Sequence, residues 1–225
     1  MDQKQKYKDV TIIIPTLNEE KNMNALLRQI NLKEYEVIIV DGHSTDKTVE
    51  IAKKFGIKVL YDDKGKGSAL RKGMNASAEE IVITMDADLS HRISELGLLV
   101  EAINSGYDIC MGSRFILGGG TDDMPLHRKI GNKLFVFLVN SIWRANYSDL
   151  CYGYRSFRRD IIKKLNLESD GFGIETEISI KSAKQKLKII EIPSFEKKRM
   201  HGTAKLHSLR DGWEILKRIM KEVRV

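Results

Sequence analysis

The chain has 225 residues, of which 42% are hydrophobic and 31% charged, and its formal net charge is +7. This length is enough to bury a full hydrophobic core, and the positive charge favours an anionic partner such as a nucleotide, a lipid phosphate, a membrane surface or a nucleic acid. Only Cys110 and Cys151 are present, which excludes a disulfide framework, and the longest apolar run, residues 134–139, is too short for a membrane span of about 20 residues.

The first 113 residues alternate predicted strands and helices. Apolar runs predict strands at residues 10–14, 36–40, 57–61, 81–85 and 107–111. Between them, apolar residues recur at helical spacing, as in Met23, Leu26 and Ile30, with Asn18 placed to cap that helix. Such alternation predicts an α/β fold with a mostly parallel, Rossmann-like sheet flanked by helices.

The pattern changes after Gly112. Residues 118–120 are three glycines and predict a flexible loop. Residues 130–143 predict an apolar-rich helix, and residues 209–223 predict a basic amphipathic helix that contains Trp213. Both helices suit packing against the sheet, and both also suit contact with an anionic membrane surface.

Two aspartates one residue apart, Asp86 and Asp88, follow the apolar run at residues 81–85. Open α/β sheets bind ligands at the carboxyl ends of their strands. Mg²⁺ or Mn²⁺ takes one or two carboxylates, keeps some waters and fills its other positions with phosphate oxygens. The pair therefore predicts a metal-bound diphosphate, and the alternative is a solvated acidic turn. The histidines show no ligand spacing, so a zinc site is not expected.

Five segments carry a resemblance to a known family. They are Pro15-Thr16-Leu17-Asn18-Glu19, Val40 to Asp46, Asp86 to His91, Gly112-Ser113-Arg114-Phe115, and Asp149 to Phe157. In this order they resemble the family 2 nucleotide-sugar glycosyltransferases, in the branch of the polyprenyl-phosphate glycosyltransferases typified by dolichol-phosphate mannose synthase. The resemblance implies a GT-A fold and a metal-dependent transfer of a hexose, with inversion, from a nucleoside-diphosphate sugar to a polyprenyl phosphate.

The resemblance also implies how the chain is organised. It implies a single glycosyltransferase domain over residues 1–225, with a nucleotide-sugar-binding half at 10–113, an acceptor-binding half at 114–206 and a C-terminal amphipathic helix at 207–225. With no apolar signal segment at residues 1–9, we expect a cytoplasmic protein that contacts the membrane peripherally. No nucleic-acid motif is present, and no nucleic-acid partner is expected.

The resemblance assigns residues to the donor. Residues along the nucleoside are Pro15, Leu17 and Glu19, and those at the base are Ile39 and Asp41. Ribose, diphosphate and a Mg²⁺ or Mn²⁺ ion are held by Asp86, Ala87 and Asp88, and Ser90 matches a position that is a metal-ligating glutamine in some relatives. Leu17 and Gly42-His43 depart from the usual family pattern, so both GDP- and UDP-linked sugars remain open.

The resemblance assigns basic residues to the phosphates of donor and acceptor. These residues are Arg114, Arg128, Arg199 and Lys205. With Asp88, two of them, Arg114 and Arg128, are the expected catalytic residues. A phosphate-monoester acceptor has a second pKa near 6 and is largely a dianion at pH 7, so it needs no general base. A sugar hydroxyl acceptor, the main alternative, would need one, and Asp122 or Asp123 could serve.

Several alternatives stay open at this point. Glu175 and Glu177 either complement a helix dipole or lie near the acceptor. Asp149 and Arg155 form either a buried structural pair or part of the acceptor site. A sugar nucleotidyltransferase would share the sheet and the acidic metal site, and a non-catalytic nucleotide-binding domain would share the positive charge.

Overall fold

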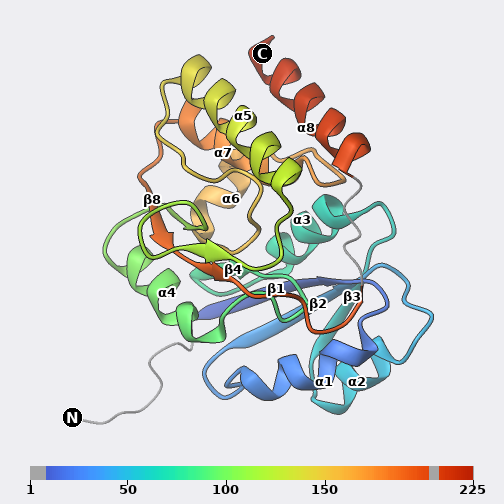
Figure 1. The fold of residues 1–225 in the computed structure, drawn as a ribbon. Helices are drawn as coiled ribbons and strands as arrows, with labels where there is room; N and C mark the ends of the chain where they lie inside the picture. The colour runs from blue at the N-terminus through green and yellow to red at the C-terminus, as the bar shows by residue number, and fades with distance from the viewer. Residues whose placement is uncertain (1–8, 203–207, 225) are drawn as a thin grey trace.

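The computed structural model describes residues 9–202 and 208–224, and its centre is one seven-stranded sheet. The strands are β1 (Val10–Thr16), β2 (Glu36–Asp41), β3 (Lys58–Tyr61), β4 (Ile81–Thr84), β5 (Ile109–Ser113), β7 (Arg155–Arg158) and β8 (Ile189–Pro193). Their order across the sheet is β3-β2-β1-β4-β7-β5-β8 (Figure 1). Only β7 runs antiparallel to its neighbours, so the prediction of a mostly parallel sheet is confirmed.

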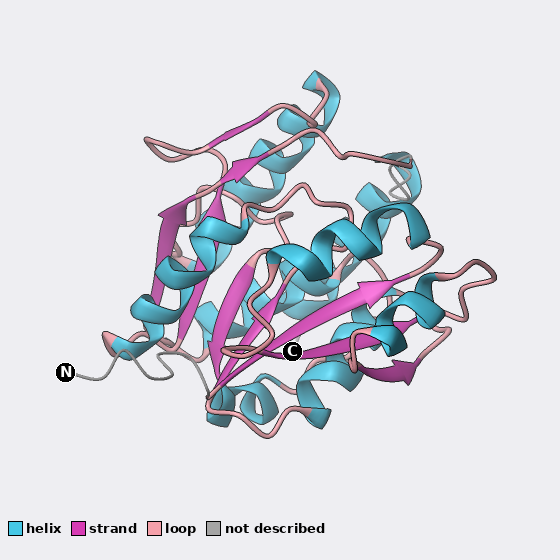
Figure 2. Cartoon of the chain, turned by 90° about the horizontal axis from the view of Figure 1, so that it is seen from below, coloured by secondary structure: helices cyan, strands magenta, loops and turns pink. Residues whose placement is uncertain are grey.

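Helices cover both faces of this sheet (Figures 1 and 2). One face packs against α1 (Glu20–Gln29), α2 (Thr48–Lys54) and α4 (Leu96–Asn104). The other face is covered by α3 (Lys66–Ala76), α6 (Arg159–Leu165) and α7 (Ile174–Lys184). Helices α5 (Leu126–Trp143) and α8 (Ser208–Val223) lie further out in the same hydrophobic cluster. Among the described residues, no helix has the length and apolar character needed to cross a membrane.

The apolar runs form strands because both of their faces are covered. Ile12 and Ile14 point into the core beneath α1 and α4, while Ile13 points into the core beneath α3. All three side chains are fully buried. A continuous β-branched run is therefore favoured in this central strand, as parallel sheets require.

Two local predictions were wrong, and strand β7 was not predicted. Asn18 does not cap α1, because its backbone is left-handed and its Oδ1 accepts the Thr45 N–H, while Glu19 occupies the N-cap position. The glycine-rich segment is not wholly a loose loop, because β6 (Gly120–Thr121) pairs with β9 (Phe195–Glu196) in a second, two-stranded sheet. The sequence reasoning also did not foresee β7, which inserts between β4 and β5.

Helices α5 and α8 lie side by side at the outer edge of the molecule, beyond α7 (Figure 1). Helix α8 is tied to α7 by buried ion pairs. Arg218 lies 3.3 Å from Glu177 and 3.2 Å from Glu222, and Lys184 also pairs with Glu222. The orientation of α8 is therefore fixed by specific charges as well as by Ile215 and Ile219 in the core.

Candidate active site

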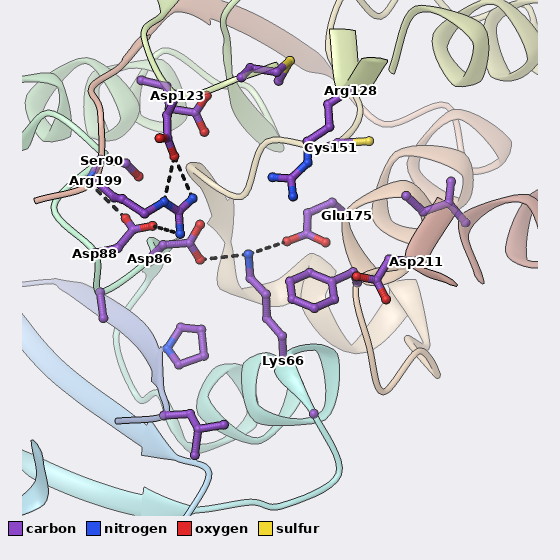
Figure 3. A pocket seen from close by; sticks show the side chains of 18 of the residues that line it. Lys66, Asp86, Asp88, Ser90, Asp123, Arg128, Cys151, Glu175, Arg199 and Asp211 are labelled. Atoms are coloured by element: carbon purple, nitrogen blue, oxygen red, sulfur yellow. Dashed lines mark hydrogen bonds and ion pairs between the residues drawn. The ribbon is translucent and has the colours of Figure 1, made fainter. Parts of the chain in front are cut away.

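A cavity of about 490 Å³ opens at the carboxyl ends of β1 and β4. Its floor is formed by the segments that follow these strands and by the first turn of α3, and α5, α7 and α8 wall its other side (Figure 3). The carboxyl edge of a parallel sheet is the usual ligand site of such folds. At the centre of this cavity, most of the charged side chains belong to two ion-pair groups.

The first, the Lys66 group, consists of Lys66, Asp86 and Glu175. The Lys66 Nζ lies 2.8 Å from Asp86 Oδ1 and 2.9 Å from Glu175 Oε1. These residues come from α3, from the segment after β4 and from the first turn of α7, so three distant parts of the chain meet at one ammonium (Figure 3). Gly153 leaves room for them, because a Cβ there would meet Lys66 Nζ at 3.1 Å and Glu175 Oε1 at 3.3 Å.

Electrostatics keep the Lys66–Asp86 pair charged. Burial by itself favours the neutral form of Asp86, but the positive charges of Lys66 and Arg199 outweigh it and lower the pKa of Asp86 to about 2. Burial would likewise lower the pKa of Lys66, and the two carboxylates beside it raise that pKa instead. His91 accepts the Asp86 N–H through Nδ1, and burial lowers the pKa of its ring, so it is neutral at pH 7.

The second, the Arg199 group, consists of Arg199, Asp88 and Asp123. The Arg199 guanidinium donates two hydrogen bonds to Asp123 Oδ2, at 2.7 and 2.9 Å, and its Nη1 lies 3.5 Å from Asp88 Oδ2. The other Asp88 oxygen accepts the Ser90 N–H at 3.0 Å. The Lys197 N–H donates to the Ser90 carbonyl oxygen, which fixes the segment that carries Arg199 over the aspartates.

These groups suit a divalent cation whose remaining coordination positions are filled by a bound ligand and water. Asp86 and Asp88 face one cavity from a single turn, and carboxylates are the donors that Mg²⁺ prefers. The two groups together carry four acids and two bases, a formal charge of −2 that one divalent ion balances. Within residues 9–202 and 208–224, no three His, Cys, Asp or Glu side chains cluster as a complete cage, so water and phosphate oxygens would supply the remaining ligands.

The expected nucleoside residues divide into two sets. Pro15, Leu17, Glu19 and Ala87 line the cavity, and their contact with the nucleoside stays a prediction. Ile39 and Asp41 do not line it, and both side chains are fully buried. Asp41 instead accepts hydrogen bonds from the Thr16 and Ser44 hydroxyls and from the Ser44 N–H, so it shapes the loop at the nucleoside end. In this geometry a direct contact of Ile39 or Asp41 with the base is not supported.

The expected basic residues also divide. Arg128 and Arg199 line the cavity, and Arg128 points into it from α5, next to Glu175 (Figure 3). Lys205 lies outside the described residues. Arg114 is at the cavity wall but is buried, with hydrogen bonds to Asp149 at 2.7 and 2.9 Å and to Glu196 at 3.1 Å. These carboxylates overcome the effect of burial and raise the pKa of Arg114, so the geometry favours a structural role for it over a phosphate contact.

The structure also decides between readings that the sequence left open. Asp149 pairs with Arg114 rather than with Arg155, whose guanidinium donates to the carbonyl oxygens of Leu150, Tyr152 and Glu175. Glu177 is buried against Lys181 and Arg218, away from the cavity, whereas Glu175 lines it. Ser90 is buried beside Asp88 and lines the cavity, and its metal ligation stays a prediction.

Lys66 was not assigned any role from the sequence. The available signal was its position between two glycines. Gly65 has a φ of +132°, and a Cβ on Gly67 would lie 2.4 Å from the Ser169 carbonyl oxygen. These glycines let the turn press against residues 169–171, which places Lys66 in the cavity.

Comparisons with known proteins show the family of this chain. The chain belongs to the Glycosyl transferase family 2, whose model matches residues 11–165. It is 33% identical to a dolichol-phosphate mannosyltransferase from Pyrococcus furiosus. The match covers 88% of this chain but only 59% of the length of that relative. It is 31% identical to a dolichyl-phosphate hexose transferase from Haloferax volcanii, over 96% of this chain and 94% of that one.

The fold is also that of solved relatives. Glucosyl-3-phosphoglycerate synthase from Mycobacterium tuberculosis, solved with Mn²⁺ and UDP, superposes with a TM-score of 0.76 at 18% identity, covering 97% of this chain and 81% of that one. This match confirms the GT-A fold. The family membership makes the protein a glycosyltransferase, and the nucleotidyltransferase and non-catalytic alternatives are set aside.

Proposed function

We propose that this protein transfers a hexose from a GDP- or UDP-linked sugar to a polyprenyl phosphate, with a Mg²⁺ or Mn²⁺ ion and with inversion at the anomeric carbon. The observation that carries this proposal is the convergence of Asp86, Asp88, Arg128 and Arg199 on one cavity at the carboxyl edge of the sheet. The names of the relatives from Pyrococcus furiosus and Haloferax volcanii support the lipid-phosphate acceptor.

The donor end is built to stabilise a departing diphosphate. Breaking a glycosyl phosphate bond places negative charge on the leaving nucleoside diphosphate. Asp86 and Asp88 would hold the divalent ion, which when bound supplies Lewis-acid stabilisation of that charge. Arg199 adds a fixed positive charge from the segment above Asp88. Of the three expected catalytic residues, Asp88 and Arg128 keep that role in this proposal, whereas Arg114 is held by Asp149 and Glu196.

The acceptor end suits a second anion. A phosphate monoester is largely a dianion at pH 7 and attacks the anomeric carbon without a base, and such a single displacement inverts the configuration. Arg128 is the residue we assign to that phosphate, because it points into the cavity from the wall opposite β1. A hydroxyl acceptor would need a base, and the Asp123 carboxylate accepts two hydrogen bonds from Arg199, which does not favour that role.

The same cavity continues toward an apolar surface. Phe135 of α5 and Ile215 of α8 line it, so a prenyl chain could leave between these helices. Both helices expose large apolar side chains, which are Leu126, Ile130, Leu134, Phe137, Ile142, Trp213, Met220 and Val223. We assign this surface to peripheral contact with the cytoplasmic face of a membrane, which positions the acceptor at the cavity.

A transfer assay tests the proposal. Purified protein with Mg²⁺ or Mn²⁺ is given GDP-mannose, UDP-glucose and other nucleotide sugars with a short polyprenyl phosphate, and products are identified by mass spectrometry and by the anomeric coupling constant in NMR. The proposal requires an inverted glycosyl phosphate that disappears on chelation. The matched control is the corresponding polyprenol, which lacks the phosphate. Equal transfer to this alcohol, or to free sugars only, would contradict the proposed acceptor.

A further inference from the structure

Lys66 has donor capacity that its protein partners do not use. An ammonium carries three N–H donors, and Lys66 has two ion-pair partners, Asp86 Oδ1 at 2.8 Å and Glu175 Oε1 at 2.9 Å. The side chain is 17% exposed, and it lines the cavity. Its third N–H is therefore available to a ligand oxygen at the place where the sequence and the fold put the donor.

The surroundings of Lys66 hold it there firmly. Gly65 and Gly67 press its turn against residues 169–171, with the Gly67 and Ser68 N–H groups both donating to the Asp170 carbonyl oxygen. The ring of Phe172 lies 5.8 Å from the ammonium and covers it from a third side. A lysine has about 2 kcal/mol of side-chain rotamer entropy to lose, and here the protein has already restricted it before a ligand arrives.

A purely structural role explains this arrangement poorly. Burying an ammonium between two carboxylates seldom stabilises a fold more than apolar packing would. Groups with strongly shifted ionisation that face a cavity are typical of binding sites.

We infer that Lys66 binds the nucleotide-sugar donor through its third N–H, to a diphosphate or sugar oxygen, and positions Asp86 and Glu175 around it. This inference rests on the proposed function and adds a donor-binding residue to it. In this role the ammonium separates two carboxylates that would otherwise repel each other and the anionic donor. Through its two ion pairs, Lys66 links Asp86 at the donor end of the cavity to Glu175 on the wall formed by α7.

The test compares three variants by calorimetric titration of GDP and UDP in the presence of Mg²⁺. Lys66→Met removes the charge and the donors while keeping an unbranched side chain, and Lys66→Arg keeps the charge. Lys64→Met is the matched control, because Lys64 is an exposed lysine in the same turn. We expect Lys66→Met to weaken nucleotide binding by about 10- to 100-fold, Lys66→Arg to recover part of it, and Lys64→Met to match the wild type.

A double variant separates donor binding from simple neutralisation of Glu175. If Lys66 only balanced that carboxylate, Lys66→Met with Glu175→Gln would bind nucleotide as tightly as Glu175→Gln alone. We expect the double variant to stay at least about tenfold weaker than Glu175→Gln. Thermal unfolding checks that each variant is folded, and the Lys66→Arg comparison still applies if the methionine variant does not fold.

The outcomes separate this inference from the proposed function. Unchanged nucleotide affinity in Lys66→Met, or full recovery in the double variant, overturns the role of Lys66 while the wild type still binds and transfers. A wild type that binds neither GDP nor UDP with Mg²⁺ overturns the proposed function, and the role of Lys66 with it.

Discussion

The substitution Asp88→Asn removes one negative charge and almost no volume. The amide oxygen still accepts the Ser90 N–H, which Asp88 Oδ1 accepts at 3.0 Å. Arg199 keeps its two hydrogen bonds to Asp123. The fold should therefore lose no more than about 1 kcal/mol, which for a chain of this size shifts Tm by about 2–4 °C.

The effect on catalysis should be far larger. A divalent ion held by Asp88 would depend on the negative charge of its carboxylate, which the asparagine amide lacks. Removing one group that stabilises developing charge typically costs a factor of about 10² to 10³ in kcat, and we expect that range for Asp88→Asn.

The assay measures initial transfer rates over a series of Mn²⁺ and Mg²⁺ concentrations. Asp88→Asn should lower kcat and raise the metal concentration needed for half-maximal activity. Glu80→Gln is the matched control, because Glu80 is an exposed acid at the opposite end of β4. If the variant kept more than about a tenth of the wild-type kcat with an unchanged metal requirement, the reasoning about Asp88 would be wrong.

Three further predictions concern other parts of the molecule. Arg128→Gln should raise KM for the polyprenyl phosphate by about tenfold or more while leaving KM for the donor nearly constant, and the reverse pattern in steady-state kinetics would misplace the acceptor. Arg218→Met should destabilise the fold by about 2–3 kcal/mol, which lowers Tm by about 4–12 °C in calorimetry. Glu177 and Glu222 each lose one buried partner in this variant, but Glu177 keeps Lys181 and Glu222 keeps Lys184. An unchanged Tm would contradict this prediction. The pKa of Glu177 lies below its ordinary value of 4.5, because hydrogen bonds from Lys181 and Ser169 outweigh the opposing effect of burial. The stability that ionised Glu177 contributes is therefore present above about pH 4.5 and is lost as the pH falls below that value. Glu177→Gln should therefore show a flatter decline of Tm in acid than the wild type, and parallel curves would refute the linkage.

The sheet and the donor end of the site could be predicted because their signals are local. The five strands up to residue 113 are marked by apolar runs, and Asp86 and Asp88 closely follow one of them. Local signals also marked both outer helices, α5 and α8. The insertion of β7 depends instead on pairing with β4 and β5, and no pattern within Arg155–Arg158 specifies that placement.

The roles of charged residues were less predictable, because they depend on long-range partners. Arg114 matched a phosphate-binding position, yet Asp149 and Glu196 bind it from 35 and 82 residues away. Lys66 drew no assignment, although Asp86 and Glu175 meet it in the fold. A side chain's partner decides whether its charge is available to a ligand, and only the tertiary structure gives that partner.

The most direct test of the account is a crystal of the protein soaked with Mn²⁺ and the nucleoside diphosphate that binds best. We predict an anomalous difference peak for one Mn²⁺ ion within coordination distance of the Asp86 and Asp88 carboxylates and of the diphosphate oxygens. A bound nucleotide with no metal between these aspartates, and with Asp86 and Asp88 still paired only to Lys66 and Arg199, would contradict the central claim.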